Sequence, residues 1–173
     1  MTWPADLLAA ATIIVLVLAA WSDIAARIIP NGLVVALAAI GLLGRAAAGL
    51  PSLAISIALA AALFLLLVLA HARGVMGGGD VKLASAMALG LSPESVYRFV
   101  LITALAGGVL GCVHLVLRRV FRGASATPPR RDASLLRRVA VAERWRIARS
   151  GSLPYGMAIA CGGIWTVLAS PGG

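Results

Sequence analysis

Two aspartates, Asp23 and Asp80, are the residues of this chain best suited to chemistry. Each lies at the edge of an apolar segment beside helix-breaking residues, in "WSDIAARIIPNGL" and "MGGGDVKL" respectively. An ionisable side chain in or next to a membrane span is costly and is a candidate functional residue. Two carboxylates held close together share a proton near neutral pH, so one can activate water while the other polarises a carbonyl. The pair therefore predicts aspartic peptide hydrolysis, which needs neither a metal nor a cofactor.

Each aspartate taken alone also has a purely structural interpretation. Asp80, after three glycines, could be the N-cap of the helix that follows. Asp23 could pair with Arg27 four residues later on the same helix. Two acids on the same side of one helical bundle favour the catalytic interpretation over these two separate ones.

The glycine run before Asp80 also resembles nucleotide-binding loops, but the details exclude them. A phosphate-binding P-loop needs a lysine where Asp80 stands, and a carboxylate there would repel phosphate. A dinucleotide fingerprint would need a glycine in place of Lys82. Lys82 and Ser85 could form a Ser–Lys dyad on one helical face, but no oxyanion hole is evident beside them.

The composition is that of a membrane protein. Hydrophobic residues make up 61% of the 173 residues, charged residues only 12%, and the mean hydropathy is +1.01. Soluble domains are nearer to half apolar and a quarter charged. We therefore expect an all-α polytopic membrane protein that forms a single domain over residues 1–173.

A helix needs about 20 mostly apolar residues to cross the hydrocarbon core. Six segments are candidates, although the fourth is short: about 4–22, 32–50, 52–72, 80–91, 95–117 and 153–169. The first lacks the basic n-region of a signal peptide, so we expect a retained helix whose N-terminus is outside.

The distribution of basic residues predicts the orientation of the spans. With the N-terminus outside, the cytoplasmic stretches are about 23–31, 73–80 and 118–152. Arg27, Arg73, Lys82 and ten arginines of the long loop lie in or beside them, which is 13 of the 15 basic residues. The positive-inside rule therefore predicts six spans, both termini outside and both aspartates at the cytoplasmic edge.

The basic loop at 118–152 carries most of the net charge of +9. It has no repeated aromatic residues on which bases could stack, so we do not expect it to bind nucleic acid. Residues 132–149 have a broad apolar face that Arg146 interrupts. The pattern predicts an interfacial helix in contact with anionic lipid.

The two cysteines and two histidines do not form a recognisable metal site. Cys112 and Cys161 lie inside apolar runs and outside any C-x-x-C pair, so we expect buried free thiols. His71 and His114 are far apart and lack ligand spacing. We therefore predict no bound metal.

Three motifs together resemble the type IV prepilin leader peptidases, a family of membrane aspartic proteases. "GGGD", residues 77–80, fits that family's G-x-G-D signature and continues as "VKLASAMALGL". Asp23 followed by Ile29-Pro30-Asn31 resembles its first aspartate and I-P-N turn, and "LPYGMAIACGG" resembles its last helix. The resemblance covers essentially the whole chain.

The resemblance implies that Asp23 and Asp80 are the catalytic pair of a peptidase in the bacterial inner membrane. Such enzymes remove the short basic leader of type IV pilin-like precursors on the cytoplasmic side, and pilus assembly machinery is a further expected partner. The residues expected to bind substrate or support the pair are Gly77, Gly78, Gly79, Lys82, Pro30, Asn31, Pro154, Tyr155 and Gly156.

Larger members of the family carry a cytoplasmic domain with paired C-x-x-C cysteines, and many also methylate the new pilin N-terminus. This sequence shows neither that domain nor those cysteines and resembles the compact form of tight-adherence (Flp-type) systems. We therefore expect no methyltransferase activity.

Two other functions stay open from the residues alone. The aspartates could be proton or cation sites of a small transporter or channel subunit. The chain could also be a non-catalytic scaffold of a pilus or secretion machine, with the arginine-rich loop as its docking surface.

Overall fold

The computed structural model describes residues 3–120 and 154–169, which confirms the all-α prediction for these parts of the chain. They form six helices, and short turns join the first five. In chain order, the helices are α1 (Trp3–Ala26), α2 (Asn31–Ala47), α3 (Leu50–Ala72), α4 (Gly78–Leu89), α5 (Pro93–Val120) and α7 (Tyr155–Ala169).

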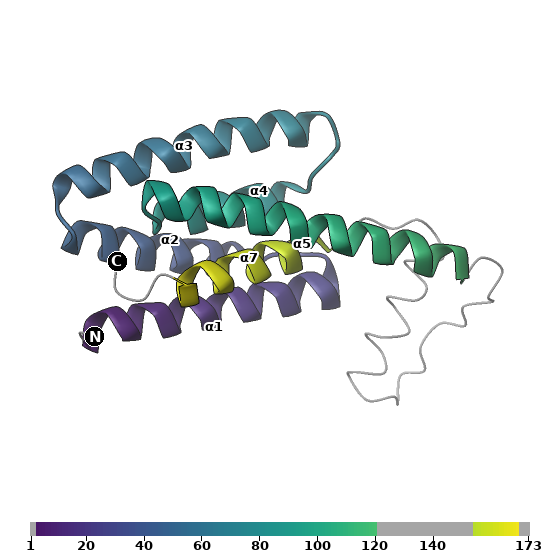
Figure 1. Cartoon of the computed structure of the whole chain (residues 1–173), viewed down its shortest axis with the longest axis horizontal. Coiled ribbons are helices and arrows are strands. Elements are labelled where there is room, and N and C mark those ends of the chain that lie inside the picture. The colour runs from purple at the N-terminus through teal and green to yellow at the C-terminus, as the bar shows by residue number, and fades with distance from the viewer. Residues whose placement is uncertain (1–2, 121–153, 170–173) are drawn as a thin grey trace.

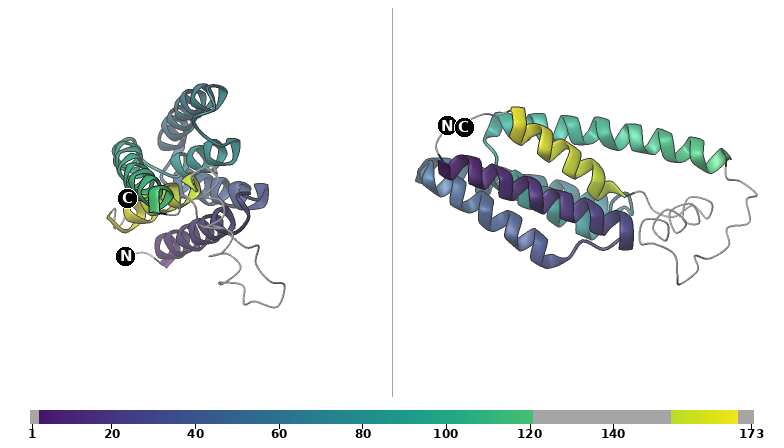
Figure 2. Two further views of the ribbon diagram at one scale, coloured as in Figure 1. Left: turned by 90° about the vertical axis from the view of Figure 1, so that its right-hand side faces the viewer. Right: turned by 90° about the horizontal axis from the view of Figure 1, so that it is seen from below.

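Consecutive described helices run in opposite directions along one bundle (Figure 1). α7 lies between α1 and α5, while α4 contacts α2, α3 and α7 (Figures 1 and 2). At one end of the bundle, α1 and α3 end and α2, α4 and α7 begin; we call it the site end. The start of α1 and the end of α7 both lie at the opposite end.

Within the described residues, three helices are long and apolar enough to cross a membrane: α1 over Ala5–Ala26, α3 and α5. Their outward residues are largely apolar and exposed, among them Ile14, Leu65, Leu66, Leu105 and Val109. Such a continuous apolar exterior is stable against lipid chains but not against water. The structure and the composition therefore both indicate a membrane protein.

The short helix α4 is the centre of the bundle. It has only 12 residues, begins at Gly78 and ends at Leu89, where the sequence predicts about 80–91. Most of its side chains are buried on all sides, so it has no single apolar face. Leu83 and Met87 of α4 pack into the core with residues from four other helices: Leu16, Ala19, Leu37, Phe99, Ile159 and Ala160.

The helix ends follow from local sequence. α3 ends in a Schellman motif: Gly74 has φ of +72°, and its N–H donates to the His71 carbonyl at 2.8 Å. The Val75 N–H donates to the Ala70 carbonyl at 3.0 Å. A side chain would be strained at Gly74, so the glycine fixes where α3 stops. Pro30, with extended backbone angles, directly precedes α2.

Two sequence-based expectations need correction. α1 continues to Ala26, so Asp23 lies within its last turns rather than beyond a span ending at residue 22. Cys112 and Cys161 are free but exposed, because each points outward from its helix and away from the core. The basic loop begins in the last turn of α5. Its remainder, with the helix predicted at 132–149, lies outside the described residues.

Candidate functional site

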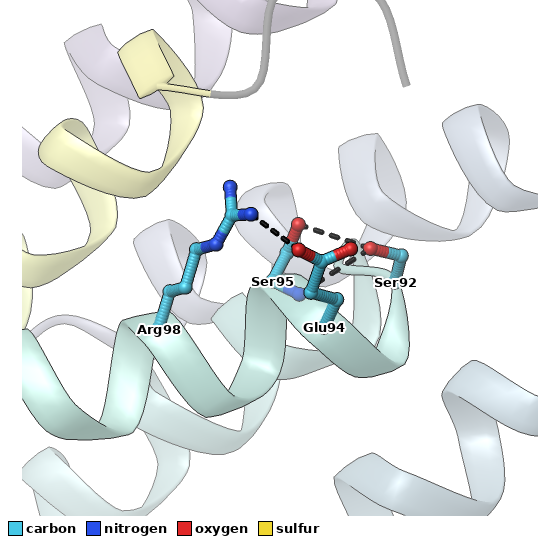
Figure 3. Close-up of polar contacts among 4 residues, drawn as sticks. All are labelled: Ser92, Glu94, Ser95 and Arg98. Carbon is cyan, nitrogen blue, oxygen red and sulfur yellow. Dashed lines mark hydrogen bonds and ion pairs between the residues drawn. The ribbon is translucent and has the colours of Figure 1, made fainter.

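Four of the six acidic residues lie in the described part of the chain, and only two of these four are buried. Glu94 is exposed and pairs with Arg98 one turn later, beside the Ser92–Ser95 hydrogen bond that starts α5 (Figure 3). Asp6 is exposed in the first turn of α1. Asp23 and Asp80 are only 6% and 9% exposed, and both lie at the site end.

Local hydrogen bonds fix a sharp turn at the end of α1, close to Asp23. Arg27 has φ of +57°, a left-handed conformation that non-glycine residues seldom adopt, and its N–H donates to the Asp23 carbonyl at 2.8 Å. The Ser22 hydroxyl donates to the Ile28 carbonyl at 2.7 Å. These bonds turn the chain sharply after Ala26 and bring Ile29 back against the bundle.

The Asp23 carboxylate caps a different helix. Its Oδ2 accepts a hydrogen bond from the Gly156 N–H, in the first turn of α7, at 2.9 Å. Pro154, just before α7, has no side-chain oxygen that could cap the helix itself. An acidic side chain at a helix N-terminus satisfies a free N–H group and interacts favourably with the helix dipole. The carboxylate of α1 thus takes the place of a local cap on α7.

Asp80 is the third residue of α4 and not its N-cap, which is Gly77. Its carboxylate accepts a hydrogen bond from the Gly77 N–H, as the acidic residue of a capping box does. Asp80 therefore does cap α4, but from the third position of the helix and not as its N-cap.

The Asp23 and Asp80 carboxyl groups are close enough to repel each other, and the positive charge of Arg27 attracts the Asp80 carboxylate. Each carboxylate accepts an N–H at the start of a helix, Asp23 on α7 and Asp80 on α4. The partial positive charges of two helix N-termini offset part of the repulsion between two buried acids. This arrangement explains how a bundle with so few charges holds both acids at one end.

The I-P-N turn packs directly against the glycine run. A side chain on Gly79 would lie 3.4 Å from Cβ of Ile29, so the turn after α1 sits on the first turn of α4. Lys82 Nζ lies 3.4 Å from Oδ1 of Asn31 and donates a long, exposed hydrogen bond to it. The two motifs are therefore in contact, with Pro30 exposed between Ile29 and Asn31.

Not every predicted site residue faces the acids. Tyr155 packs against Gly107 of α5, where a side chain on that glycine would meet the phenol oxygen at 2.7 Å. Gly78 faces the ring of His71, at the end of α3. Arg27 and His71 are near the acids in space but were absent from the predicted site. The positive-φ conformation of Arg27 and the contact of His71 with the glycine run arise only on folding.

The geometry supports water-mediated acid–base chemistry. Two buried carboxyl groups from helices far apart in sequence lie close to each other at one end of an apolar bundle. One carboxyl group in its ionised form can accept a proton from water while the other, protonated, donates one to a carbonyl oxygen. Neither step requires a covalent intermediate.

Comparison with known proteins supplies one match. The family model described as the type IV leader peptidase family matches residues 10–112. This range contains Asp23, the I-P-N turn, the glycine run and Asp80, but not Gly156. Neither the curated proteins nor the solved structures compared with the chain gave a match.

Proposed function

Because the chain belongs to the type IV leader peptidase family, we propose that it is a membrane aspartic endopeptidase that removes the leader from type IV prepilins. Precursors of Flp-like pilins are the expected substrates. The observation that carries the proposal is the meeting of two buried carboxyl groups, Asp23 and Asp80, at the site end. The family match alone does not assign either residue a role.

In this mechanism the ionised aspartate takes a proton from water, and the oxygen of that water bonds to the scissile carbonyl carbon. The protonated aspartate gives its proton to the carbonyl oxygen, forming a neutral gem-diol. The C–N bond then breaks, the first aspartate returns its proton to the leaving nitrogen, and the second regains one from the diol. Both carboxyl groups end in their starting states.

The neighbouring residues shape the approach to this pair. Gly77 and Gly79 have no side chains, so a substrate can approach the backbone beside Asp80 closely. The hydrogen bond from Lys82 to Asn31 links α4 to the start of α2. We assign Pro30, Gly78 and the Pro154–Gly156 segment to support of the same site. The segment does this through the Gly156 N–H bond to Asp23.

We further propose six spans in the bacterial inner membrane, with the site end at the cytoplasmic face. The alternating helices, with the start of α1 and the end of α7 at one end of the bundle, support an even number of crossings. Arg27, Arg73, Arg118 and Arg119 all lie at helix ends toward the site end, in agreement with the positive-inside rule.

The arginine-rich loop is assigned to contact with anionic lipid headgroups and not to nucleic acid. Its arginines follow directly on Arg118 and Arg119 in the last turn of α5. Basic residues beside a membrane surface each gain about 1 kcal/mol from anionic lipids. Pilus assembly proteins are a second proposed partner, at the same face.

Leader removal tests the function directly. The chain is co-expressed with a candidate Flp-like prepilin, and the precursor is followed by gel shift. We expect cleavage by the parent and by Asp6→Asn, the same substitution at an exposed acid at the far end of α1. Asp23→Asn and Asp80→Asn should leave the precursor intact. Normal processing by either of these two variants would exclude the aspartic mechanism.

The same experiment separates the alternatives. If the chain is a transporter or a scaffold, the parent should leave the prepilin uncleaved. A scaffold acting through the arginine-rich loop would also lose function on loop truncation while Asp→Asn changes had no effect. Methylation of the mature pilin N-terminus, detected by mass spectrometry, would contradict the expectation of a single activity.

Orientation is tested by labelling single cysteines in a background with Cys112 and Cys161 replaced by serine. A cysteine at Arg73, in the turn after α3, should react with a membrane-impermeant maleimide only after the cells are opened. A cysteine at Ala48, between α2 and α3, should react in intact cells whose outer membrane is permeabilised. The reverse pattern would invert the proposed orientation.

A further inference from the structure

His71, one residue before the end of α3, bonds to the backbone that leads into the glycine run. Its Nδ1 lies 2.8 Å from the carbonyl oxygen of Met76. A carbonyl oxygen can only accept, so Nδ1 carries the hydrogen and donates it. The ring also lies against Gly78, with Cε1 3.5 Å from the position that a Cβ would occupy there. His71 therefore contacts the turn on both sides of Gly77.

The bonded carbonyl belongs to the peptide group that also holds Asp80. The Met76 carbonyl and the Gly77 N–H are the two ends of one planar trans peptide unit and point in opposite directions. The carbonyl accepts from His71, and the N–H donates to the Asp80 carboxylate. A single rigid group thus connects the imidazole to the acid.

The backbone of His71 is fixed by the end of α3, while its side chain is exposed. The Schellman motif that ends α3 uses the His71 carbonyl as the acceptor for the Gly74 N–H at 2.8 Å. The same motif bonds Val75 to Ala70. Two backbone hydrogen bonds therefore hold the turn from α3 as far as Val75, and the Met76–Gly77 peptide follows it directly.

We propose that His71 is a positioning residue, which locks the Met76–Gly77 peptide so that the Gly77 N–H is directed at Asp80. Without it the peptide can rotate, because glycine on one side allows many backbone angles. Asp80 would then lose a hydrogen bond and its fixed orientation. The inference rests on the proposed function of Asp80 and adds a residue to it that no sequence motif marks.

Three substitutions at His71 separate the hydrogen bond from the bulk of the ring. His71→Asn places an amide N–H at the same distance along the side chain as Nδ1, whereas His71→Gln places it one bond farther out. His71→Ala removes the donor entirely. His114→Ala, at the other histidine, on α5, is the matched control.

We expect His71→Ala and His71→Gln to lower kcat for leader removal by roughly five- to tenfold, the equivalent of one lost hydrogen bond. KM should not change, because His71 orients Asp80 and is not assigned to the substrate. His71→Asn and His114→Ala should stay within about twofold of the parent. An Asn variant as slow as the Ala variant, or an Ala variant as fast as the parent, would overturn the proposal.

A second measurement does not depend on activity. Hydrogen exchange of the peptide covering residues 73–79, followed by mass spectrometry in nanodiscs, should become faster in His71→Ala and remain unchanged in His71→Asn. Unchanged exchange in His71→Ala would show that the bond does not hold the turn. A parent that cleaves no prepilin, with exchange as expected, would refute the proposed function and leave the His71 contact supported.

Discussion

Asp23 in α1 and Gly156 in α7 are joined by a hydrogen bond from the Gly156 N–H to Oδ2 of Asp23, 2.9 Å long. The two residues are 133 positions apart, and Gly156 lies outside the range that the family model matches. The bond caps α7 and at the same time orients one of the two buried acids. Stability and activity are therefore coupled at Asp23, and substitutions can separate them.

Asp23→Ala and Asp23→Asn should differ in stability but not in activity. Alanine removes the cap on α7, which costs about 1 kcal/mol of unfolding free energy. Asparagine keeps an oxygen that can accept the Gly156 N–H, so its loss should be smaller. Both variants should be inactive in leader removal, because neither has a carboxyl group. Unfolding in mixed micelles and the gel-shift assay measure the two effects, and equal stability of the two variants would contradict the capping role.

Gly156→Ala should impair cleavage strongly, although the substitution adds only one methyl group. A Cβ at this position would lie 2.8 Å from Oδ2 and 3.0 Å from Cβ of Asp23, so the carboxylate or α7 must move. We expect the cleavage rate to fall at least about tenfold, since small misplacements of a catalytic group have large effects. The control is Gly108→Ala on α5, where a Cβ would meet nothing within 4 Å. A Gly156→Ala enzyme as active as this control would show that the contact is not needed.

The first two glycines of the run should respond differently to alanine. A Cβ on Gly77 would lie 2.9 Å from Oδ2 of Asp80, and the carboxylate must shift to make room. A Cβ on Gly78 would make ordinary contact with the His71 ring at 3.5 Å. We therefore expect Gly77→Ala to lose most of the leader-removal rate and Gly78→Ala to keep most of it. Comparable rates for the two variants, measured side by side, would contradict this geometry.

Ser56→Ala should destabilise the bundle without slowing catalysis. The buried Ser56 hydroxyl accepts from Arg45 Nε at 2.9 Å and donates to the Leu91 carbonyl at 3.0 Å, tying α2, α3 and the turn before α5. Losing both bonds should cost about 1 to 3 kcal/mol. Because these bonds lie at the end opposite the acids, kcat per folded molecule should not change.

The control for this prediction is Ser52→Ala, the same substitution one turn earlier in α3. It should change the unfolding free energy by less than about 0.5 kcal/mol. Thermal unfolding in nanodiscs measures both variants. A drop in kcat for Ser56→Ala at equal folded protein would mean that the far end of the bundle acts on the site.

The helical class and both candidate acids could be predicted from residue order alone. Hydropathy predicts α1, α3 and α5 because these helices face outward over most of their length. It defines α4 poorly, because a central helix that packs on all sides needs small residues more than a long apolar run. The sequence places the start of α4 at Asp80, two residues after its start at Gly78, because the N-cap is a glycine and has no capping side chain. The interaction of His71 with Met76 left no periodic pattern to detect.

The sequence by itself determined the chemical groups at the site. These are two acids beside helix-breaking residues, a run of glycines before the second acid, and basic residues concentrated on the predicted cytoplasmic side. These depend on residue type and local spacing. Only the tertiary structure decided that Asp23 caps α7, that Ile29 sits on Gly79, and that His71 reaches Asp80 through one peptide group. The reason is physical: such contacts join helices far apart in the chain, and packing of the whole bundle sets their distances.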